Sequence, residues 1–461
     1  MEARRDAGAR VLRLLALYVG LIAVFVVAMT AVYSLPQERI IANAAKSADL
    51  LRGEGLHPTL LIPDTAYQLD NYTDALMIDA AIIAPLRPPF EAAMMIAHGA
   101  KENAAGRVDP IEGLTETVRG NRTSPTPYAY YWHGYQTLLR PALLFLDLSG
   151  IRYLNILLLA VLTTVVLMGL RDQAGMPAAV AFGLALAITG YLIVPASIQL
   201  SNMTYLMLAA TLAVLGLSRS GRLVAFRWEI FFVVGVLAAF FDLLTTPLLT
   251  LTVPLAVGLA VRVRRECASF SNQVRFAVSA AASWALGYVG SWLAKVAIAW
   301  LAVDRNILQT VARQALWRAS LGAGPEGSVP VTIAETLSDN AVRLVPFISA
   351  DSLGGGFWES AGPLVVVVAI VFAAGAVVFV RFRRPWAEIA RAAHVLLVVP
   401  LPYLWFAVAR QHSWAHAFFT YRIQLSSVFA VIFLLLSAID FDRVRSGLLY
   451  WRRPASDSPM P

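Results

Sequence analysis

Long apolar stretches constrain this chain more than any other feature of its sequence. A helix needs roughly 20 mostly apolar residues to cross a hydrocarbon core of about 30 Å, and ten stretches meet that need, some by a narrow margin. The chain is 58% apolar and 14% charged, a balance that argues against a soluble enzyme. We therefore predict an all-α polytopic membrane protein with about ten transmembrane helices, at residues 11–34, 151–170, 176–194, 203–218, 228–243, 247–263, 276–301, 362–381, 393–409 and 421–439.

The distribution of arginine predicts how these helices are oriented, because short cytoplasmic loops carry an excess of Lys and Arg. The outer connections near 195–202 and 244–246 carry neither residue, and the one near 410–420 carries Arg410 alone. Both ends of the chain are therefore predicted to be cytoplasmic, and the net charge of +8 gives no reason to expect a nucleic-acid partner. The predicted inner clusters are Arg4, Arg5, Arg10 and Arg13, then Arg171, then Arg219, Arg222 and Arg227, then Arg262, Arg264, Arg265 and Arg275, then Arg381, Arg383, Arg384 and Arg391.

Two long segments then face outward, and they divide the chain. The first is too long to be a passive connector and contains helical-looking patches at 36–52 and 74–84. Residues 136–148 are apolar but too short to span, which favours an interfacial or re-entrant helix. Scarce Lys beside abundant Arg and Ala favours a bacterial source, and thus the cytoplasmic membrane of a bacterium. The predicted division is 1–34 (cytoplasmic end and first helix), 35–150 (large outer loop with interfacial helices), 151–301 (helices two to seven), 302–361 (second outer loop), 362–439 (helices eight to ten) and 440–461 (cytoplasmic tail).

The densest polar cluster of the first outer loop runs from Asp70 to Asp79. On a helix Asp70 and Asp74 share one face, so two carboxylates could converge at the membrane surface. Paired or partly desolvated carboxylates suit general base catalysis, because their pKa moves toward neutrality. The alternative is that Asp70 caps a helix beginning near Thr73.

A second cluster lies between the last two predicted helices, from Arg410 to Arg422. His412 and His416, four residues apart with arginines on either side, would form a cationic patch suited to a phosphate or pyrophosphate. The same histidine pair fits a metal, but no carboxylate lies nearby in sequence to complete such a site. We predict no metal site and leave a divalent cation as an optional cofactor. An interfacial loop anchored by aromatic residues is the structural alternative.

Three further features could line a cavity. Asp242 ends the fifth predicted helix just before a Pro turn, and charged residues at membrane depth tend to face a cavity or a partner. Lys295 is similar, although it could simply extend its side chain to the interface. Tyr131 and His133 belong to an aromatic lip that favours an interfacial belt over a sugar-stacking platform, and Arg140 could reach the same surface.

The chain resembles the GT-C superfamily of polytopic glycosyltransferases, which take sugar from a polyprenyl-phosphate carrier. The resemblance rests on the cytoplasmic N-terminus, one helix and a large first outer loop, on DNYTDALMI at 70–78, and on YWHGY at 131–135 followed by Arg140 and Pro141. FDLLTTP at 241–247 and HSWAHAFFTYR at 412–422 are similar to outer-end patches of such proteins. The chain lacks the WWD-type acceptor motif of oligosaccharyltransferases.

The resemblance implies a hexosyl or pentosyl transferase acting at the outer face of the membrane. Its partners would be a polyprenyl-phosphate-linked sugar donor, a cell-envelope glycan acceptor and membrane lipid. Asp74, with Asp70 as rival, would deprotonate the acceptor hydroxyl, and an Asp74→Ala chain would fold but lose sugar transfer. Arg422, His412, His416 and Arg140 would hold the lipid phosphate, and Asp242 would shape the cavity floor.

Two other classes compete with this interpretation. A transporter or flippase of a lipid-linked glycan or another anionic lipid would use the same patch, but should show broken helices and paired repeats near the midplane. We find no repeat, and the polar residues gather at the outer helix ends, which favours the enzyme. A membrane scaffold whose outer loop binds a partner would tolerate replacement of Asp74. The sequence contains no Walker A loop, dinucleotide fingerprint, metalloprotease helix or nucleophile elbow.

Overall fold

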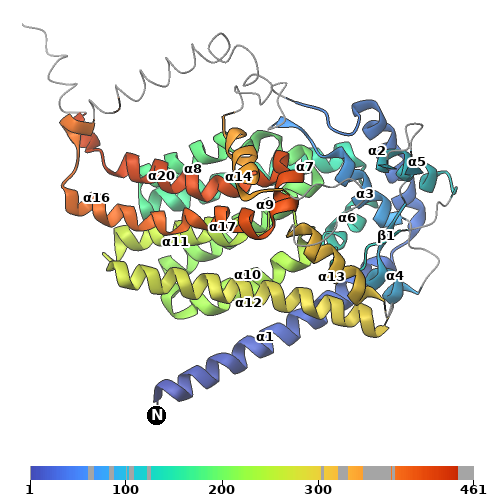
Figure 1. Cartoon of the computed structure of the whole chain (residues 1–461), viewed down its shortest axis with the longest axis horizontal. Helices are drawn as coiled ribbons and strands as arrows, with labels where there is room; N and C mark the ends of the chain where they lie inside the picture. Colours follow the sequence, from blue (N-terminus) through green and yellow to red (C-terminus); the bar gives the residue numbers. More distant parts are fainter. Residues whose placement is uncertain are drawn as a thin grey trace, which may run out of the picture.

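The fold is a bundle of long helices with a layer of short helices at one end (Figure 1). A computed structural model describes residues 2–60, 67–82, 88–99, 101–102, 108–121, 126–302, 306–319, 331–345, 375 and 379–444. Apart from two antiparallel pairs of two-residue strands, the regular elements described are helices. The all-α prediction is therefore confirmed for the described residues.

Within the described residues, seven helical segments are long and apolar enough to cross a membrane, so the chain is a multi-pass membrane protein. Two other predicted spans form shorter helices, 176–194 and 247–263, and most of predicted helix 362–381 lies outside the described residues. The count of ten therefore stays a prediction. The seven spans are Gly8–Tyr33, Leu148–Ala174, Ile198–Arg219, Leu223–Phe241, Phe270–Ala302, Trp386–Val408 and Ala417–Ser437.

The two shorter helices differ in how they end and in how deeply they are buried. In the first, a helix of 13 residues ends at Ile188 and the chain continues as a 3-10 segment that contains Pro195. In the second, a helix of 17 residues is buried along almost its whole length, so other helices surround it. The bundle consists of α1 (Glu2–Tyr33), α7 (Leu148–Ala174), α8 (Met176–Ile188), η2 (Tyr191–Ala196), α9 (Ile198–Arg219), α10 (Leu223–Phe241), α11 (Leu249–Arg265), α12 (Phe270–Ala302), α16 (Trp386–Ala392), η4 (Ala393–Val398), α17 (Pro400–Val408) and α20 (Leu425–Ser437).

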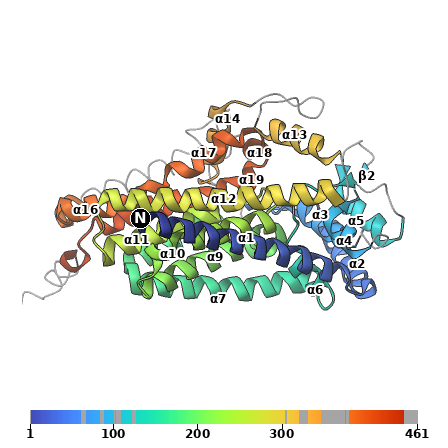
Figure 2. The ribbon, with the colours of Figure 1, turned by 90° about the horizontal axis from the view of Figure 1, so that it is seen from below.

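Small residues bring α10 and α12 into close contact. A Cβ atom on Gly287 would lie 2.2 Å from the carbonyl oxygen of Phe232, and one on Gly235 would lie 2.1 Å from that of Trp284. Close backbone approach at small residues is a common way for membrane helices to associate, because lipid provides no hydrophobic force between them. The helix α1 runs beside this pair, and the hydroxyl of Tyr18 donates to the carbonyl of Gly290 at 2.9 Å (Figure 2).

The described part of segment 35–150, called the outer layer below, covers one end of the bundle (Figure 1). Helices lie over the predicted patches 36–52, 74–84 and 136–148, each with boundaries shifted by a few residues. This layer consists of α2 (Gln37–Glu54), α3 (Asn71–Ile82), α4 (Pro89–Met95), β1 (Ala97–His98), β2 (Lys101–Glu102), β3 (Val108–Asp109), α5 (Pro110–Val118), β4 (Thr126–Pro127) and α6 (Gln136–Leu143); β1 pairs with β4 and β2 with β3.

Short helices from the C-terminal half lie near the same end of the bundle. One of these helices begins with a capping box at Thr332 and Glu335. This helix contacts the residues that follow α17. These elements are α13 (Ile307–Arg318), α14 (Ile333–Val342), α18 (Arg410–Ala415), α19 (Ala417–Thr420) and η5 (Tyr421–Gln424). The helix ends that carry the arginine clusters lie at the opposite end of the bundle, because α7, α9 and α11 finish there.

Candidate active site

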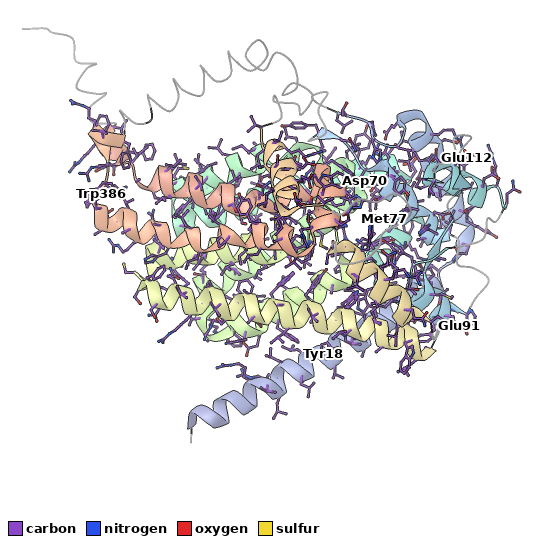
Figure 3. The ribbon with its side chains drawn as sticks, viewed as in Figure 1. Tyr18, Asp70, Met77, Glu91, Glu112 and Trp386 are labelled. Carbon is purple, nitrogen blue, oxygen red and sulfur yellow. The ribbon has the colours of Figure 1, made fainter. Side chains whose placement is uncertain are left out.

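A cavity of about 460 Å³ lies where the outer layer meets the bundle. Two of its lining residues, Asp70 and Met77, are labelled at this junction in Figure 3. Five of the six histidines in the chain line it, although they come from segments more than 350 residues apart. The lining residues are His57, Asp70, Tyr72, Thr73, Leu76, Met77, Ala80, Ile96, Ala97, His98, Tyr128, His133, Tyr135, Gln199, Leu243, Trp317, Arg318, His412, Ala415, His416, Phe418 and Phe419.

Asp70 is the carboxylate among the described lining residues, and it also caps α3. Its Oδ1 accepts a hydrogen bond from the backbone N–H of Thr73 at 3.1 Å, as expected of a residue directly before a helix. The side chain is buried, and burial raises its pKa, opposed by the Thr73 hydrogen bonds and the nearby His57. A carboxylate has more acceptor sites than one cap uses, so capping and a role in the cavity are compatible.

The residue after Asp70 fixes where this carboxylate lies. Asn71 donates to Glu54 Oε2 at 2.9 Å and to the Gly55 carbonyl at 2.8 Å. Arg152 in turn donates to both carboxylate oxygens of Glu54, at 2.6 and 3.0 Å, and to the Asn71 side chain at 3.1 Å. This network joins the first turn of α3 to α2 and α7, so Asp70 is held by three elements. Bidentate Arg–carboxylate pairs are among the more rigid polar contacts in proteins.

Asp74 is not among the described residues that line the cavity. Its carboxylate accepts hydrogen bonds from the Ser197 hydroxyl and from the backbone N–H groups of Ile198 and Gln199, each at 3.1 Å. These donors form the N-terminus of α9, whose partial positive charge favours a carboxylate there. Burial raises the pKa of Asp74 to about 7, a value that would suit a base, but its oxygens are already occupied by the helix end.

Arg318 provides the positive charge of the cavity. Its Nη1 donates to Nδ1 of His412 at 3.0 Å, and its guanidinium lies 5.8 Å from the centroid of the Tyr131 ring. Burial acts to lower the pKa of Arg318, but the neighbouring tyrosines raise it above its usual value, so the group stays charged. Among the described residues no carboxylate forms an ion pair with Arg318, which leaves its charge available to a ligand.

His412 orients Arg318 as a neutral imidazole. Because a guanidinium cannot accept a hydrogen bond, Nδ1 of His412 must be the acceptor, and Nε2–H therefore donates to the carbonyl of Leu244 at 2.6 Å. Burial places the pKa of His412 well below its usual value, and the neighbouring His416 and Arg318 lower it further. Both nitrogens are thus in use, and His412 positions the cation without itself carrying charge.

His416 lies beside this pair in an aromatic environment. Its ring stacks on Phe419 with centroids 5.1 Å apart, and the His412 ring is 4.7 Å away. Burial lowers the pKa of His416 to about 4, helped by Arg318 and His57. The lowered pKa values favour neutral imidazoles near pH 7, so in the described wall of the cavity the positive charge beside these histidines is that of Arg318.

The predicted aromatic lip forms another wall of the cavity. His133 lines it, with Nδ1 3.1 Å from the Tyr135 hydroxyl and Nε2 2.8 Å from the Tyr128 carbonyl. Burial lowers the pKa of His133 to about 3, so the neutral imidazole donates to the carbonyl and accepts from the phenol. Tyr131 is buried behind this wall, in ring contact with Tyr128 and Tyr130. His133 and Tyr135 thus line the cavity with Tyr128, and Tyr131 packs behind them.

Two predicted cations hold the outer layer to the bundle. Arg140 is fully buried and donates to the carbonyls of Val32 and Ala81, with its guanidinium over the Tyr33 ring. Lys295 is also fully buried, and its ammonium group donates to the Met94 carbonyl at 2.6 Å. Neither is among the described residues that line the cavity. Both donate to backbone carbonyls in the last turns of helices and so join the layer to the bundle.

Arg422 and Asp242 lie outside the described cavity wall as well. Arg422 donates to the Phe418 carbonyl at 2.8 Å and packs over the Tyr421 ring. The carboxylate of Asp242 accepts from the Thr245 N–H at 2.9 Å and so closes a turn. Leu243 in that turn lines the cavity, and the Leu244 carbonyl holds His412, so Asp242 acts on the site through the backbone. Burial raises the pKa of Asp242 to about 7.

Sequence reasoning missed Arg318, His57 and His98. Arg318 lies in the second outer segment, where Gly- and Pro-rich patches concealed its helix, α13. The scarcity of histidine is the signal that could have found the other two. The chain has only six histidines in 461 residues, and most lie in segments predicted to face outward, so all of them are candidate site residues. The described residues contain no group of three His, Cys, Asp or Glu side chains suited to a metal ion.

The fold and the cavity define a multi-pass helical membrane protein with a buried, largely polar and aromatic site at one end of its bundle. Comparison of the chain with protein-family models, with curated proteins and with solved structures finds no match. The assignment of function therefore depends on the residues of the cavity themselves.

Proposed function

We propose that this chain is a membrane glycosyltransferase that moves a sugar from a polyprenyl-phosphate carrier to a cell-envelope acceptor. The observation that carries the proposal is that Asp70, from the first outer segment, lines the same cavity as Arg318, His412 and His416 from the other half of the chain. One base and one fixed cation are the two groups that such a transfer requires.

Asp70 is the proposed general base. It removes the proton from an acceptor hydroxyl as that oxygen attacks the anomeric carbon of the sugar. Because burial raises the pKa of Asp70, its carboxylate is a stronger base than an exposed aspartate. Of the two candidates suggested by the sequence, Asp70 fits better than Asp74, whose oxygens are taken by the N-terminus of α9.

Arg318 is the proposed ligand of the leaving phosphate. When the bond between the anomeric carbon and the phosphate oxygen breaks, its electron pair stays on that oxygen, and the polyprenyl phosphate departs as an anion. A guanidinium held in place by His412 stabilises this charge without reorganising. No step requires a metal ion, although a divalent cation carried by the substrate phosphate is compatible with the chemistry.

The position of the cavity matches a lipid-linked donor facing outward. It lies at the end of the bundle opposite the arginine clusters, which the positive-inside rule assigns to the cytoplasm. A polyprenyl carrier is confined to the bilayer, so an enzyme that uses it must be embedded there. The tyrosine, tryptophan and phenylalanine side chains of the wall offer faces on which a sugar ring can stack.

The test of the donor site is Arg318→Gln, with Arg313→Gln of the same helix as the matched control. Transfer of labelled sugar from a panel of polyprenyl-phosphate-linked hexoses and pentoses is measured in membranes lacking the native protein. We expect Arg318→Gln to lower kcat/KM by roughly 10²-fold or more, the usual loss for one charge-stabilising donor. Equal activity of the two variants would contradict the assignment of Arg318.

A flippase of a lipid-linked glycan is the second candidate, and one observation favours it. The segments Trp386–Val408 and Ala417–Ser437 each combine α-helical and 3-10 pieces, and interrupted helices are typical of transporters. The two functions differ in their products, because a flippase leaves the sugar–phosphate bond intact. Release of sugar-free polyprenyl phosphate in the same assay therefore distinguishes them.

A further inference from the structure

A second cavity, of about 330 Å³, lies at the end of the bundle opposite the candidate active site. Helices α7, α8, α11, α16 and α20 surround it, close to Trp386, which Figure 3 labels at that end of the bundle. Three arginines, Arg264, Arg384 and Arg391, line it together with one carboxylate, Glu388. In the sequence these arginines serve only as signals of helix orientation.

The charges of this cavity are not balanced by the described side chains. Arg384 pairs with Glu388 at 3.1 Å. Arg391 donates to the sulfur of Cys267 at 3.6 Å, and no carboxylate among the described residues pairs with it or with Arg264. Two guanidinium groups are thus left facing one hollow. Arginine binds phosphate well because its planar fork matches two phosphate oxygens.

One of these two arginines, Arg264, lies close to the backbone of a turn. Gly175 joins α7 to α8 with φ +89, and a Cβ there would lie 2.1 Å from Nη1 of Arg264. The guanidinium therefore lies against the backbone of the turn, at the rim of the cavity.

The depth of the cavity identifies the kind of anion that fits. The spans Leu148–Ala174 and Ala417–Ser437 end beside it, so it lies at the level of lipid headgroups on the arginine-rich side. Its remaining wall is mostly apolar, with Val263, Ala392 and Phe433. We propose that this cavity binds the phosphate group of an anionic glycerophospholipid, with Arg264 and Arg391 as its ligands. This site is independent of the proposed sugar transfer.

The test compares lipid retention by purified full-length protein in detergent. Wild type, Arg264→Gln/Arg391→Gln and the control Arg219→Gln/Arg222→Gln are each titrated with phosphatidylglycerol or phosphatidylcholine and examined by native mass spectrometry. The control removes two exposed arginines at the same end of the bundle, so the change in net charge is the same. We expect about tenfold weaker retention of phosphatidylglycerol by the cavity variant alone, the loss that follows when charge-assisted hydrogen bonds are removed.

The outcomes separate the alternatives. Equal retention by the cavity variant and wild type, or an equal loss in the control, overturns the proposal. Wild type is also titrated with inorganic phosphate, and retention of phosphate without retention of phosphatidylglycerol overturns the lipid as the source of the phosphate. Where the double variant folds poorly, the exposed Arg391→Gln alone is used, and unchanged retention by that folded variant also counts against the site.

Discussion

Asp70 lies directly before α3 and Asp74 lies in its first turn, yet their surroundings give them different roles. Asp70 meets the cavity, whereas Asp74 receives three donors from the start of α9. A carboxylate in the second position stabilises the fold, because it satisfies backbone N–H groups that lie too deep to reach water.

We predict that Asp74→Ala destabilises the protein before it affects chemistry. Each buried donor left unsatisfied costs about 1–3 kcal/mol, so the melting temperature should fall by several degrees. The control is Asp49→Ala, which removes an exposed carboxylate that pairs with Arg52 on α2. Thermal unfolding of both variants in detergent is the measurement. If Asp74→Ala has the same melting temperature as Asp49→Ala and wild type but has lost sugar transfer, then Asp74 is the base.

Arg318 and His412 also have different roles, because the histidine orients the cation and carries no charge itself. The imidazole accepts from the guanidinium and donates to the Leu244 carbonyl, so it acts as a brace. Protonation of His412 would place a hydrogen on Nδ1, opposite the N–H groups of Arg318. The low pKa of His412 prevents this at neutral pH, which preserves the geometry of the cation.

At the scale of the elements, the close contact of α10 and α12 supports the floor of the cavity. Both helices are long spans, and they approach each other at Gly235 and Gly287. The turn after α10 then carries Leu243 into the cavity wall. Separation of the two helices would therefore move that wall.

We predict that Gly287→Ala lowers stability by roughly 1–3 kcal/mol, because its Cβ would collide with the Phe232 carbonyl. Gly216→Ala on α9 is the matched control. No atom lies within 4 Å of a Cβ at Gly216, and the exchange should be neutral or slightly stabilising. Thermal unfolding in detergent measures both. Identical melting of the two variants would refute the close contact.

Much of this architecture was predictable from the sequence, because apolar length and arginine position act locally. The spans that contain α1, α7, α9, α10 and α12 coincide with predicted stretches. The α11 stretch was harder to interpret, since its helix is only 17 residues long and is enclosed by others. Hydropathy records how apolar a segment is, but it does not record whether lipid or protein surrounds it.

The candidate site was less predictable than the spans. His412, His416 and Asp70 were identified because they stand in dense polar clusters, and these three do line one cavity. Arg140 and Lys295 are not among the described residues that line this cavity, and a buried cation bound to backbone carbonyls has the same sequence signal as one that meets a ligand. Arg318 was missed, since its position depends on how α13 packs over residues distant in sequence.

The whole molecule has one end rich in arginine and another that carries the outer layer and the cavity. Cys267, the single cysteine of the chain, is exposed at the arginine-rich end beside Arg391. We predict that a membrane-impermeant maleimide labels it only after intact cells are permeabilised. As a positive control, Arg119→Cys in a Cys267→Ser chain should react from outside, since Arg119 is exposed in the outer layer. Labelling of Cys267 in intact cells would reverse the proposed orientation.

We propose that sugar transfer occurs in the cavity with Asp70 as the base. The substitution Asp70→Asn separates this role from the capping of α3. Asparagine caps a helix as well as aspartate does but cannot take a proton at neutral pH, so the variant should fold normally. The measurement is release of sugar-free polyprenyl phosphate by purified protein in liposomes, supplied with labelled donors and cell-envelope acceptor. We predict release by wild type and a loss of about 10²-fold or more in Asp70→Asn. Release at the wild-type rate by a folded Asp70→Asn protein would exclude Asp70 as the base of sugar transfer.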